Sequence, residues 1–417
     1  MSTIALDPRT ASGRPGRRTL SDPLAYALSA AIIGFALFAS ATPSPLYETY
    51  SRLWGFSSVV LTLVYATYAG GVLVALLLAG RASDVAGRRP VLLIALGALI
   101  GSSALYMVAT SVAWLFAARA IQGLATGLAL ATASAGLLDF HPRRDSESVG
   151  LTNGSVSAGG LGLGALVSAT AVQLLPAPRV VPYAIGLGLF ALAFAGALVM
   201  PEPVPQRAPL RLTPQRPRVP AHVRGPFVLA ALAVASAYSI GGLFFALGPQ
   251  LGGQVFDTSN HLVTGISLFL LAGVGSAAQL AYGRRSAWAG MAGGSVALAL
   301  GVGLIALAAS DDAAALLLAG SVVGGAGFGI AFLGALRNLS AVIPPEDRAA
   351  VMSAFFLVAY SALSVPAVLA GLVETQLSLS STFAIFGAAV AALALFVALQ
   401  AWRARPRAVA VAVEARP

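Results

Sequence analysis

Residues 80–90 read GRASDVAGRRP and stand between two long apolar runs. Three arginines and one aspartate fall within these eleven residues, although only 10% of the 417-residue chain is charged and 58% is hydrophobic. A chain with so little polar surface cannot cover a water-soluble particle of this size. We therefore expect most of the chain to face lipid, with this stretch as a polar loop between two membrane-spanning helices.

Apolar runs long enough to span a bilayer extend outward from this loop in both directions. A spanning helix needs about 20 largely apolar residues, and twelve runs meet that requirement. They cover residues 24–44, 57–78, 90–109, 112–138, 149–175, 181–200, 226–248, 262–282, 287–309, 313–336, 349–373 and 381–402. The sequence thus predicts an all-α membrane protein with twelve transmembrane helices.

The basic residues are distributed unevenly between the two sides of the membrane. The net charge is +10, and all 25 basic residues are arginines. With the N-terminus in the cytoplasm, 22 arginines fall on the cytoplasmic side, Arg52 and Arg179 fall outside, and Arg119 falls within a span. This asymmetry predicts that both termini are cytoplasmic. It accounts for the basic excess as a topology signal and an attraction to anionic lipid, without nucleic acid as a partner.

The chain also contains an internal repeat. A shift of 202 residues aligns HPRRDSESVG (141–150) with IPPEDRAAVM (343–352), so that a proline, an aspartate and a valine coincide. Two six-helix pseudo-repeats around a central cavity are the plan of secondary transporters, whose substrates bind near the midplane between the halves. The expected division is an N-terminal cytoplasmic tail (1–23), a first bundle (24–200), a cytoplasmic linker (201–225), a second bundle (226–402) and a C-terminal cytoplasmic tail (403–417).

The opening stretch resembles a signature of the major facilitator superfamily. That family carries G-x-L-A-D-R-x-G-R-[RK] between its second and third helices, and Gly80, Asp84, Gly87, Arg88 and Arg89 match it here. The resemblance extends over nearly the whole chain. It implies the twelve-helix transporter fold and points most closely to bacterial drug-efflux members.

In that family, the aspartate of the motif latches the cytoplasmic face of the outward-open state by contacting a helix start in the other half. Asp139, an acid ending the fourth helix, occupies the place that completes the family's charge network. Asp84 and Arg88 stand four residues apart and can also pair locally. Val85 replaces an arginine of the signature, and an ordinary positively charged inner loop remains the alternative to a latch.

A second element lies in the fourth helix, where RAIQGLATG (119–127) resembles R-x-x-Q-G-x-G-x-G of proton-coupled members. Arg119, Gln122 and Thr126 share one helical face. A charge within the bilayer costs on the order of 3 kcal/mol on insertion scales, so Arg119 is expected to face protein or water. Glu48, just beyond the first helix, is its candidate partner for coupling. The alternative is that Arg119 braces the bundle by bonding backbone carbonyls.

Other polar and aromatic side chains in the spans are candidates for a substrate cavity. Asn153 and Ser157 follow one face of the fifth helix, where small residues equally suit helix packing. The remaining candidates are Tyr65, Tyr238, Gln279 and Tyr360, whose alternative role is packing or interface anchoring.

These features together predict a secondary active transporter of the bacterial inner membrane that works by alternating access. We expect proton-coupled antiport that exports apolar or drug-like compounds, with no enzymatic activity, cofactor or metal site. The expected partners are the lipid bilayer, a small-molecule substrate and protons, and the chain is expected to be a monomer. Two alternatives are a transporter of a small anionic metabolite, for which Arg119 would be the binding cation, and a non-transporting membrane sensor with a transporter fold.

Overall fold

The computed structural model describes residues 19–80, 82–204, 216–344 and 346–404. Within these residues the regular structure is fourteen α-helices and two short 3-10 helices, with no strand. Twelve helical segments are long and apolar enough to cross a membrane, which confirms the all-α prediction. Most of both predicted tails, and residues 205–215 of the predicted linker, lie outside the described residues.

The first six spans come before residue 200. The first is built from α1 (Asp22–Ala41), η1 (Ser44–Leu46) and α2 (Tyr47–Trp54). The other five are α3 (Ser58–Ala79), α5 (Arg88–Met107), α6 (Val112–Asp139), α7 (Ser146–Leu174) and α8 (Val181–Leu198), with the short α4 (Ala82–Ala86) between α3 and α5.

The second six spans follow the linker and η2 (Ala221–Val223). They are α9 (Arg224–Val255), α10 (His261–Tyr282), α11 (Ala287–Asp311), α12 (Ala314–Val342), α13 (Arg348–Glu374) and α14 (Leu379–Ala404). Several of them extend past the apolar runs, because helices continue into polar residues where their ends leave the hydrocarbon.

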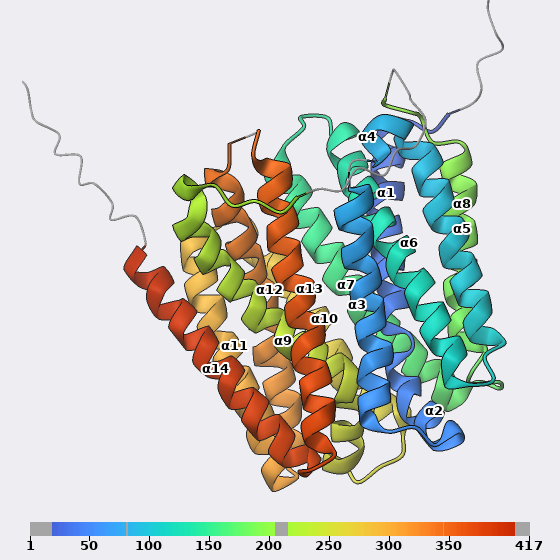
Figure 1. Ribbon diagram of the computed structural model, residues 1–417, viewed down its shortest axis with the longest axis vertical. Helices are drawn as coiled ribbons and strands as arrows, with labels where there is room; N and C mark the ends of the chain where they lie inside the picture. The colour runs from blue at the N-terminus through green and yellow to red at the C-terminus, as the bar shows by residue number, and fades with distance from the viewer. Residues whose placement is uncertain (1–18, 81, 205–215, 345, 405–417) are drawn as a thin grey trace, which may run out of the picture.

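The two halves stand side by side (Figure 1). The face on which α1 begins, α4 lies and α14 ends is called the inner face, and the opposite face, where α2 lies, is called the outer face. Helices α7 and α10 pack across the boundary between the halves, as do α3 and α13. Small residues allow this close approach: a Cβ on Gly162 of α7 would come within 2.8 Å of the Gly273 backbone nitrogen of α10.

The first span is interrupted near the outer face. Pro43 and Pro45 follow α1 directly, and a proline supplies no backbone N–H to continue the hydrogen-bonding pattern. The chain turns through η1 and resumes as α2, so the first span reaches Trp54 instead of ending at the predicted residue 44. The interruption leaves carbonyl groups at the end of α1 available to other partners.

Candidate functional site

The side chain of Arg119 lies at the centre of a polar cluster in the first half and is fully buried. Its Nε donates to the Tyr47 hydroxyl at 2.9 Å, and its Nη2 donates to the same oxygen. Its Nη1 donates to the Ser40 carbonyl oxygen at 2.9 Å and to Gln122 Oε1 at 2.7 Å. Four of the five guanidinium N–H groups are therefore engaged, and every acceptor is a neutral oxygen.

The interruption of the first span creates this cluster. Gln122 Nε2 donates to the Ala39 carbonyl at 3.0 Å, so the last turn of α1 offers two carbonyl groups to one face of α6. The carboxyl end of a helix carries partial negative charge and stabilises a cation. The rings of Tyr47, Tyr65 and Tyr68 lie 5.5, 6.0 and 5.3 Å from the Arg119 guanidinium carbon and add cation–π attraction.

Glu48 does not meet Arg119 in this structure. Its carboxylate lies 3.5 Å from the Arg52 guanidinium, one turn further along α2. Successive residues of a helix point about 100° apart, so α2 turns Tyr47 toward Arg119 and Glu48 away from it. Glu48 lines a polar pocket of 340 Å³ at the outer face together with Gln250 and Asp257. No described carboxylate forms an ion pair with Arg119.

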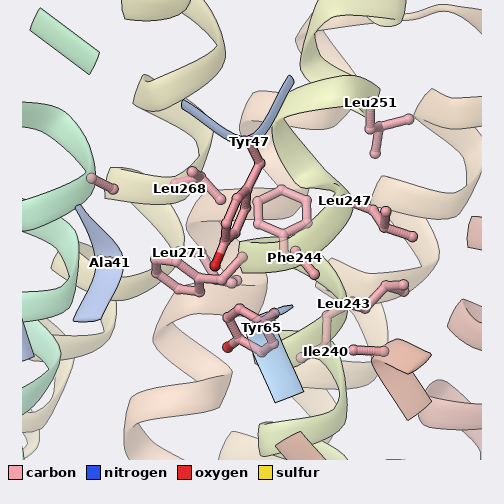
Figure 2. Close-up of a cluster of buried hydrophobic side chains, with 14 of the residues drawn as sticks. Ala41, Tyr47, Tyr65, Ile240, Leu243, Phe244, Leu247, Leu251, Leu268 and Leu271 are labelled. Atoms are coloured by element: carbon pink, nitrogen blue, oxygen red, sulfur yellow. The ribbon is translucent and has the colours of Figure 1, made fainter. Parts of the chain in front are cut away.

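Aromatic side chains from both halves meet next to this cluster. Figure 2 shows Tyr47 and Tyr65 of the first half beside Phe244 and a row of α9 leucines from the second half. The rings of Tyr238 and Tyr360 lie 6.1 Å apart in an edge arrangement. Tyr65 and Tyr360, 6% and 7% exposed, are buried, so the centre of the molecule is closed to solvent. The structure thus places these three predicted tyrosines, Tyr65, Tyr238 and Tyr360, at the boundary between the halves.

Three other predicted residues lie elsewhere. Asn153 donates to the Ser134 hydroxyl at 2.8 Å, and the Ser157 hydroxyl donates to Asn153 at 3.4 Å. Ser134 is fifteen positions after Arg119 on the same helix, α6, or about 22 Å along its axis. The buried Gln279 packs against Gly154 of α7. Asn153, Ser157 and Gln279 therefore belong to the contact of α7 with α6 and α10 near the inner face.

The motif at 80–89 forms a charge cluster at the inner face. Arg88 Nε donates to Asp139 at 2.9 Å, and its Nη1 donates to Ser83 at 2.7 Å and also to Asp84. The described hydrogen-bond and ion-pair partners of Asp84 and Asp139 lie in the first half, so the local pairing is present and the expected contact of Asp84 with the second half is not.

Glu202 is part of this cluster and was not among the predicted site residues. Its carboxylate accepts from the backbone N–H groups of Arg88 at 2.8 Å and Arg89 at 3.0 Å, where it caps α5. Gly87 has φ +100°, and a Cβ there would lie 2.6 Å from Glu202 Oε2. Glycine is required at this position by its backbone angle.

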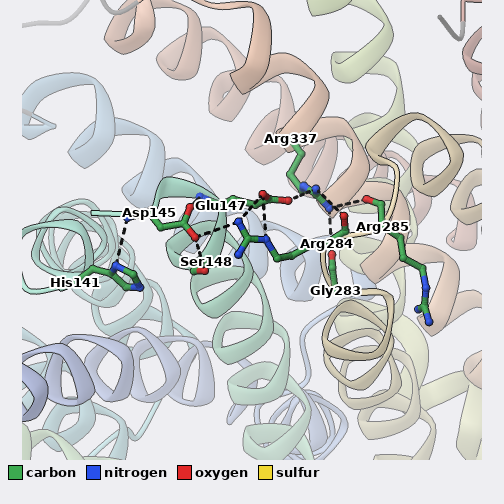
Figure 3. A network of polar contacts seen from close by, with 8 residues as sticks. All are labelled: His141, Asp145, Glu147, Ser148, Gly283, Arg284, Arg285 and Arg337. Atoms are coloured by element: carbon green, nitrogen blue, oxygen red, sulfur yellow. Dashed lines mark hydrogen bonds and ion pairs between the residues drawn. The ribbon is translucent and has the colours of Figure 1, made fainter. Parts of the chain in front are cut away.

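A second ionic network joins the two halves at the inner face (Figure 3). Glu147, in the first turn of α7, pairs with Arg337 of α12 and lies 3.1 Å from Arg284 Nη2 in the loop before α11. Asp145 lies 3.3 Å from the same Arg284 nitrogen. Hydrogen bonds from the Ser148 hydroxyl and the Glu147 backbone N–H lower the pKa of Asp145 below its ordinary value.

The sequence analysis did not identify this network. The aspartate and glutamate at the start of a helix are a capping signal, and the two arginines after Gly283 repeat the arginine pair of the opening motif. Nothing in one sequence shows that these segments meet, because Glu147 and Arg337 are 190 positions apart.

Comparisons with known proteins agree with the twelve-span architecture. A family model described as Major Facilitator Superfamily matches residues 27–365. The chain belongs to the Major Facilitator Superfamily. A search of curated proteins finds no match. Among solved structures, the human organic anion transporter MFSD10 (TETRAN) has a TM-score of 0.67 and 20% sequence identity, covering 90% of this chain and 99% of that one. This likeness shows the shared fold.

This member of the Major Facilitator Superfamily is closed at both faces. At the outer face, the His261 backbone N–H of the second half donates to Gln173 Oε1 of the first half at 3.0 Å. At the inner face, Glu147 joins Arg284 and Arg337. The side chain of Arg119 is therefore out of reach of solvent in this structure.

Proposed function

We propose that the chain is a secondary active transporter that moves small organic molecules bearing a negatively charged group by alternating access. The observation that carries this proposal is the complete burial of Arg119 without a carboxylate partner among the described residues. A buried cation is costly unless it is paired and hydrogen-bonded. In this closed conformation only the Ser40 carbonyl, the Gln122 amide oxygen, the Tyr47 hydroxyl and tyrosine rings compensate its charge.

The position of the Tyr47 hydroxyl supports an anionic substrate. This oxygen accepts from both Nε and Nη2 of Arg119, which together form one edge of the guanidinium. A carboxylate pairs with arginine through two parallel hydrogen bonds of that kind. The uncharged Tyr47 hydroxyl therefore lies at the edge of Arg119 where a carboxylate would bind. Because Tyr47 belongs to α2, beyond the interruption of the first span, opening of the outer face would withdraw it and free this edge.

The surrounding rings suit a substrate with an apolar or aromatic body. Tyr65, Tyr238 and Tyr360 offer large surfaces with a polar tip, which bind such groups well. Proton-coupled export of neutral, drug-like compounds is the second candidate function. The aromatic boundary between the halves favours it, and Arg119 would then serve coupling instead of substrate binding.

Orientation, location and assembly are part of this proposal. The arginine asymmetry supports a cytoplasmic inner face with both termini inside. We place the protein in the bacterial inner membrane as a monomer, with protons as the coupling ion for export by antiport.

The test measures flux into vesicles that contain the purified protein. Matched pairs of aromatic carboxylates and their uncharged amides serve as substrates, and flux is normalised to folded protein. We expect saturable flux for at least one acid and none for its amide. Arg119→Ala should weaken binding of that acid by about 2–5 kcal/mol, at least roughly 30-fold in Kd. Arg119→Lys should restore only part of it, because an ammonium lacks the planar fork of donors.

Arg179→Ala, at an exposed arginine of the outer face, is the matched control and should transport at the parental rate. Parental flux of the acid in folded Arg119→Ala would refute the proposal. Equal flux of acids and amides that follows an imposed pH gradient would favour the second candidate. Intact binding without flux of any compound in the panel would favour a membrane sensor.

A further inference from the structure

A groove of about 680 Å³ opens on the second half at the inner face, outside the boundary between the halves. Three helix ends form its walls: the beginning of α9, the beginning of α11 and the end of α14. The volume falls within the range of small-molecule sites. Its principal lining residues are Arg224, Val228, Leu232, Trp288, Phe396 and Gln400.

The groove faces the bilayer. Val228 and Phe396 on its walls are 53% and 47% exposed although both are apolar, and α14 forms one edge of the bundle (Figure 1). Along α9 the lining runs from Arg224 to Leu232, which is about 12 Å of helix. The hydrocarbon of one leaflet is about 15 Å thick. The groove therefore reaches from the membrane surface through most of one leaflet, the depth that an acyl chain occupies.

The mouth of the groove carries positive charge. Arg224 is the first residue of α9 and is exposed, and it forms no ion pair with a described residue. The lining contains no carboxylate. Ala404 of α14 lines the groove, whereas its neighbour Arg403 does not, so Arg224 is the only charged residue among the described lining residues. Asp347 lies 3.9 Å from His222, two residues before Arg224.

We propose that this groove binds an anionic phospholipid from the leaflet at the inner face. One acyl chain lies between α9 and α14 against Trp288, and the phosphate lies at Arg224. The combination of an apolar, lipid-facing trough with an unpaired arginine at headgroup depth is complementary to that class of lipid. The site is separate from Arg119 and does not depend on which solute is transported.

Fluorescence of Trp288 gives a local test in the full-length chain, which has four tryptophans. Phenylalanine replaces the other three, Trp54, Trp114 and Trp402, and thermal unfolding confirms that this variant matches the parent. It is then placed in phosphatidylcholine nanodiscs with increasing fractions of brominated phosphatidylglycerol or brominated phosphatidylcholine. Bromine quenches tryptophan only on contact, so quenching reports lipid in the groove.

We expect the anionic lipid to half-saturate quenching at about five-fold lower mole fraction than the zwitterionic lipid, since one arginine at the surface is worth roughly 1 kcal/mol. Arg224→Gln should remove this difference, and Arg179→Gln at the outer face should preserve it. Val228→Phe, which fills the groove, should weaken quenching by both lipids. Val296→Phe is the matched control on the lipid-facing side of α11 and should not.

Three results would overturn the proposal. Equal half-saturation by both lipids in the parent would remove the anionic preference. An unchanged preference in Arg224→Gln would remove the role of that arginine. Absence of quenching by either lipid would show that something other than lipid covers Trp288.

Discussion

Neutralising Glu147 should open the inner face of the protein. Glu147→Gln removes the charge that holds Arg284 and Arg337 of the second half, while the side chain keeps its size. The hydrogen bond from its backbone N–H to Asp145 Oδ1 at 3.0 Å is unaffected, so α7 retains its cap. The substitution therefore tests the contact between the halves and leaves the local helix intact.

The expected magnitude follows from the exposure of the partners. The side chains of Glu147 and Arg337 are 32% and 19% exposed, whereas Arg284 is 61% exposed. Ion pairs with this access to solvent contribute about 0.2–1 kcal/mol each. Losing both should shift the balance between closed and inner-open conformations by about 0.4–2 kcal/mol, or roughly 2-fold to 30-fold in population. The parent should show the same opening when salt is raised, because salt screens exposed charges.

The absence of cysteine makes the distance measurement direct. Spin labels at Val85→Cys and Val342→Cys, which are exposed at the inner ends of the two halves, report their separation by pulsed electron resonance. Arg285→Gln is the matched control, because the described contacts of its guanidinium are with backbone carbonyls and the Tyr282 ring of α10, all in the second half. An unchanged distance distribution in Glu147→Gln, at low and at high salt, would refute the assignment of this network as the inner closure.

Tyr47→Phe removes the neutral oxygen at the edge of Arg119, so we expect an anionic substrate to bind more tightly in titration calorimetry. The substitution should also lower the free energy of unfolding by about 1–3 kcal/mol, because two buried N–H donors of Arg119 lose their acceptor. Weaker anion binding would contradict this. Gly87→Ala should lower the free energy of unfolding by about 1–3 kcal/mol, because φ is +100° at this position; a thermal unfolding temperature equal to that of the parent would contradict this. The pKa of Asp145 is lower in the folded protein than the ordinary aspartate pKa of about 3.9. Its contribution to stability is therefore fully present above about pH 3.9 and is lost as the pH falls through the lower pKa of the folded state. The difference in unfolding temperature between the parent and Asp145→Ala should therefore be constant from pH 8 to about pH 5, and a loss of that difference near pH 6 would contradict the assignment.

Several features were predictable from the sequence because they depend on residues close together in the chain. Length and hydrophobicity decide whether a run can span lipid, so the twelve spans followed from composition alone. The placement of Arg119 inside a span follows from its position in an apolar run, and the pairing of Asp84 with Arg88 follows from their separation of four residues, although the pair joins α4 to α5 across Gly87. The extension of the first span to Trp54 was missed, because polar residues of α2 end the apolar run while the helix continues at the outer face.

The partners of the charged residues were decided by the tertiary structure. Arg119 meets Tyr47 and not the adjacent Glu48, because the rotation of α2 after the interruption at Pro43 and Pro45 determines which side chain faces inward. Glu147 meets Arg337 only because α7 begins and α12 ends on the same face of the assembled bundle. The groove at Arg224 likewise exists only between three helix ends that are distant in sequence. Hydrophobicity is a local property of the chain, whereas contacts between helices depend on how each helix is rotated and packed, and that is set by the whole fold.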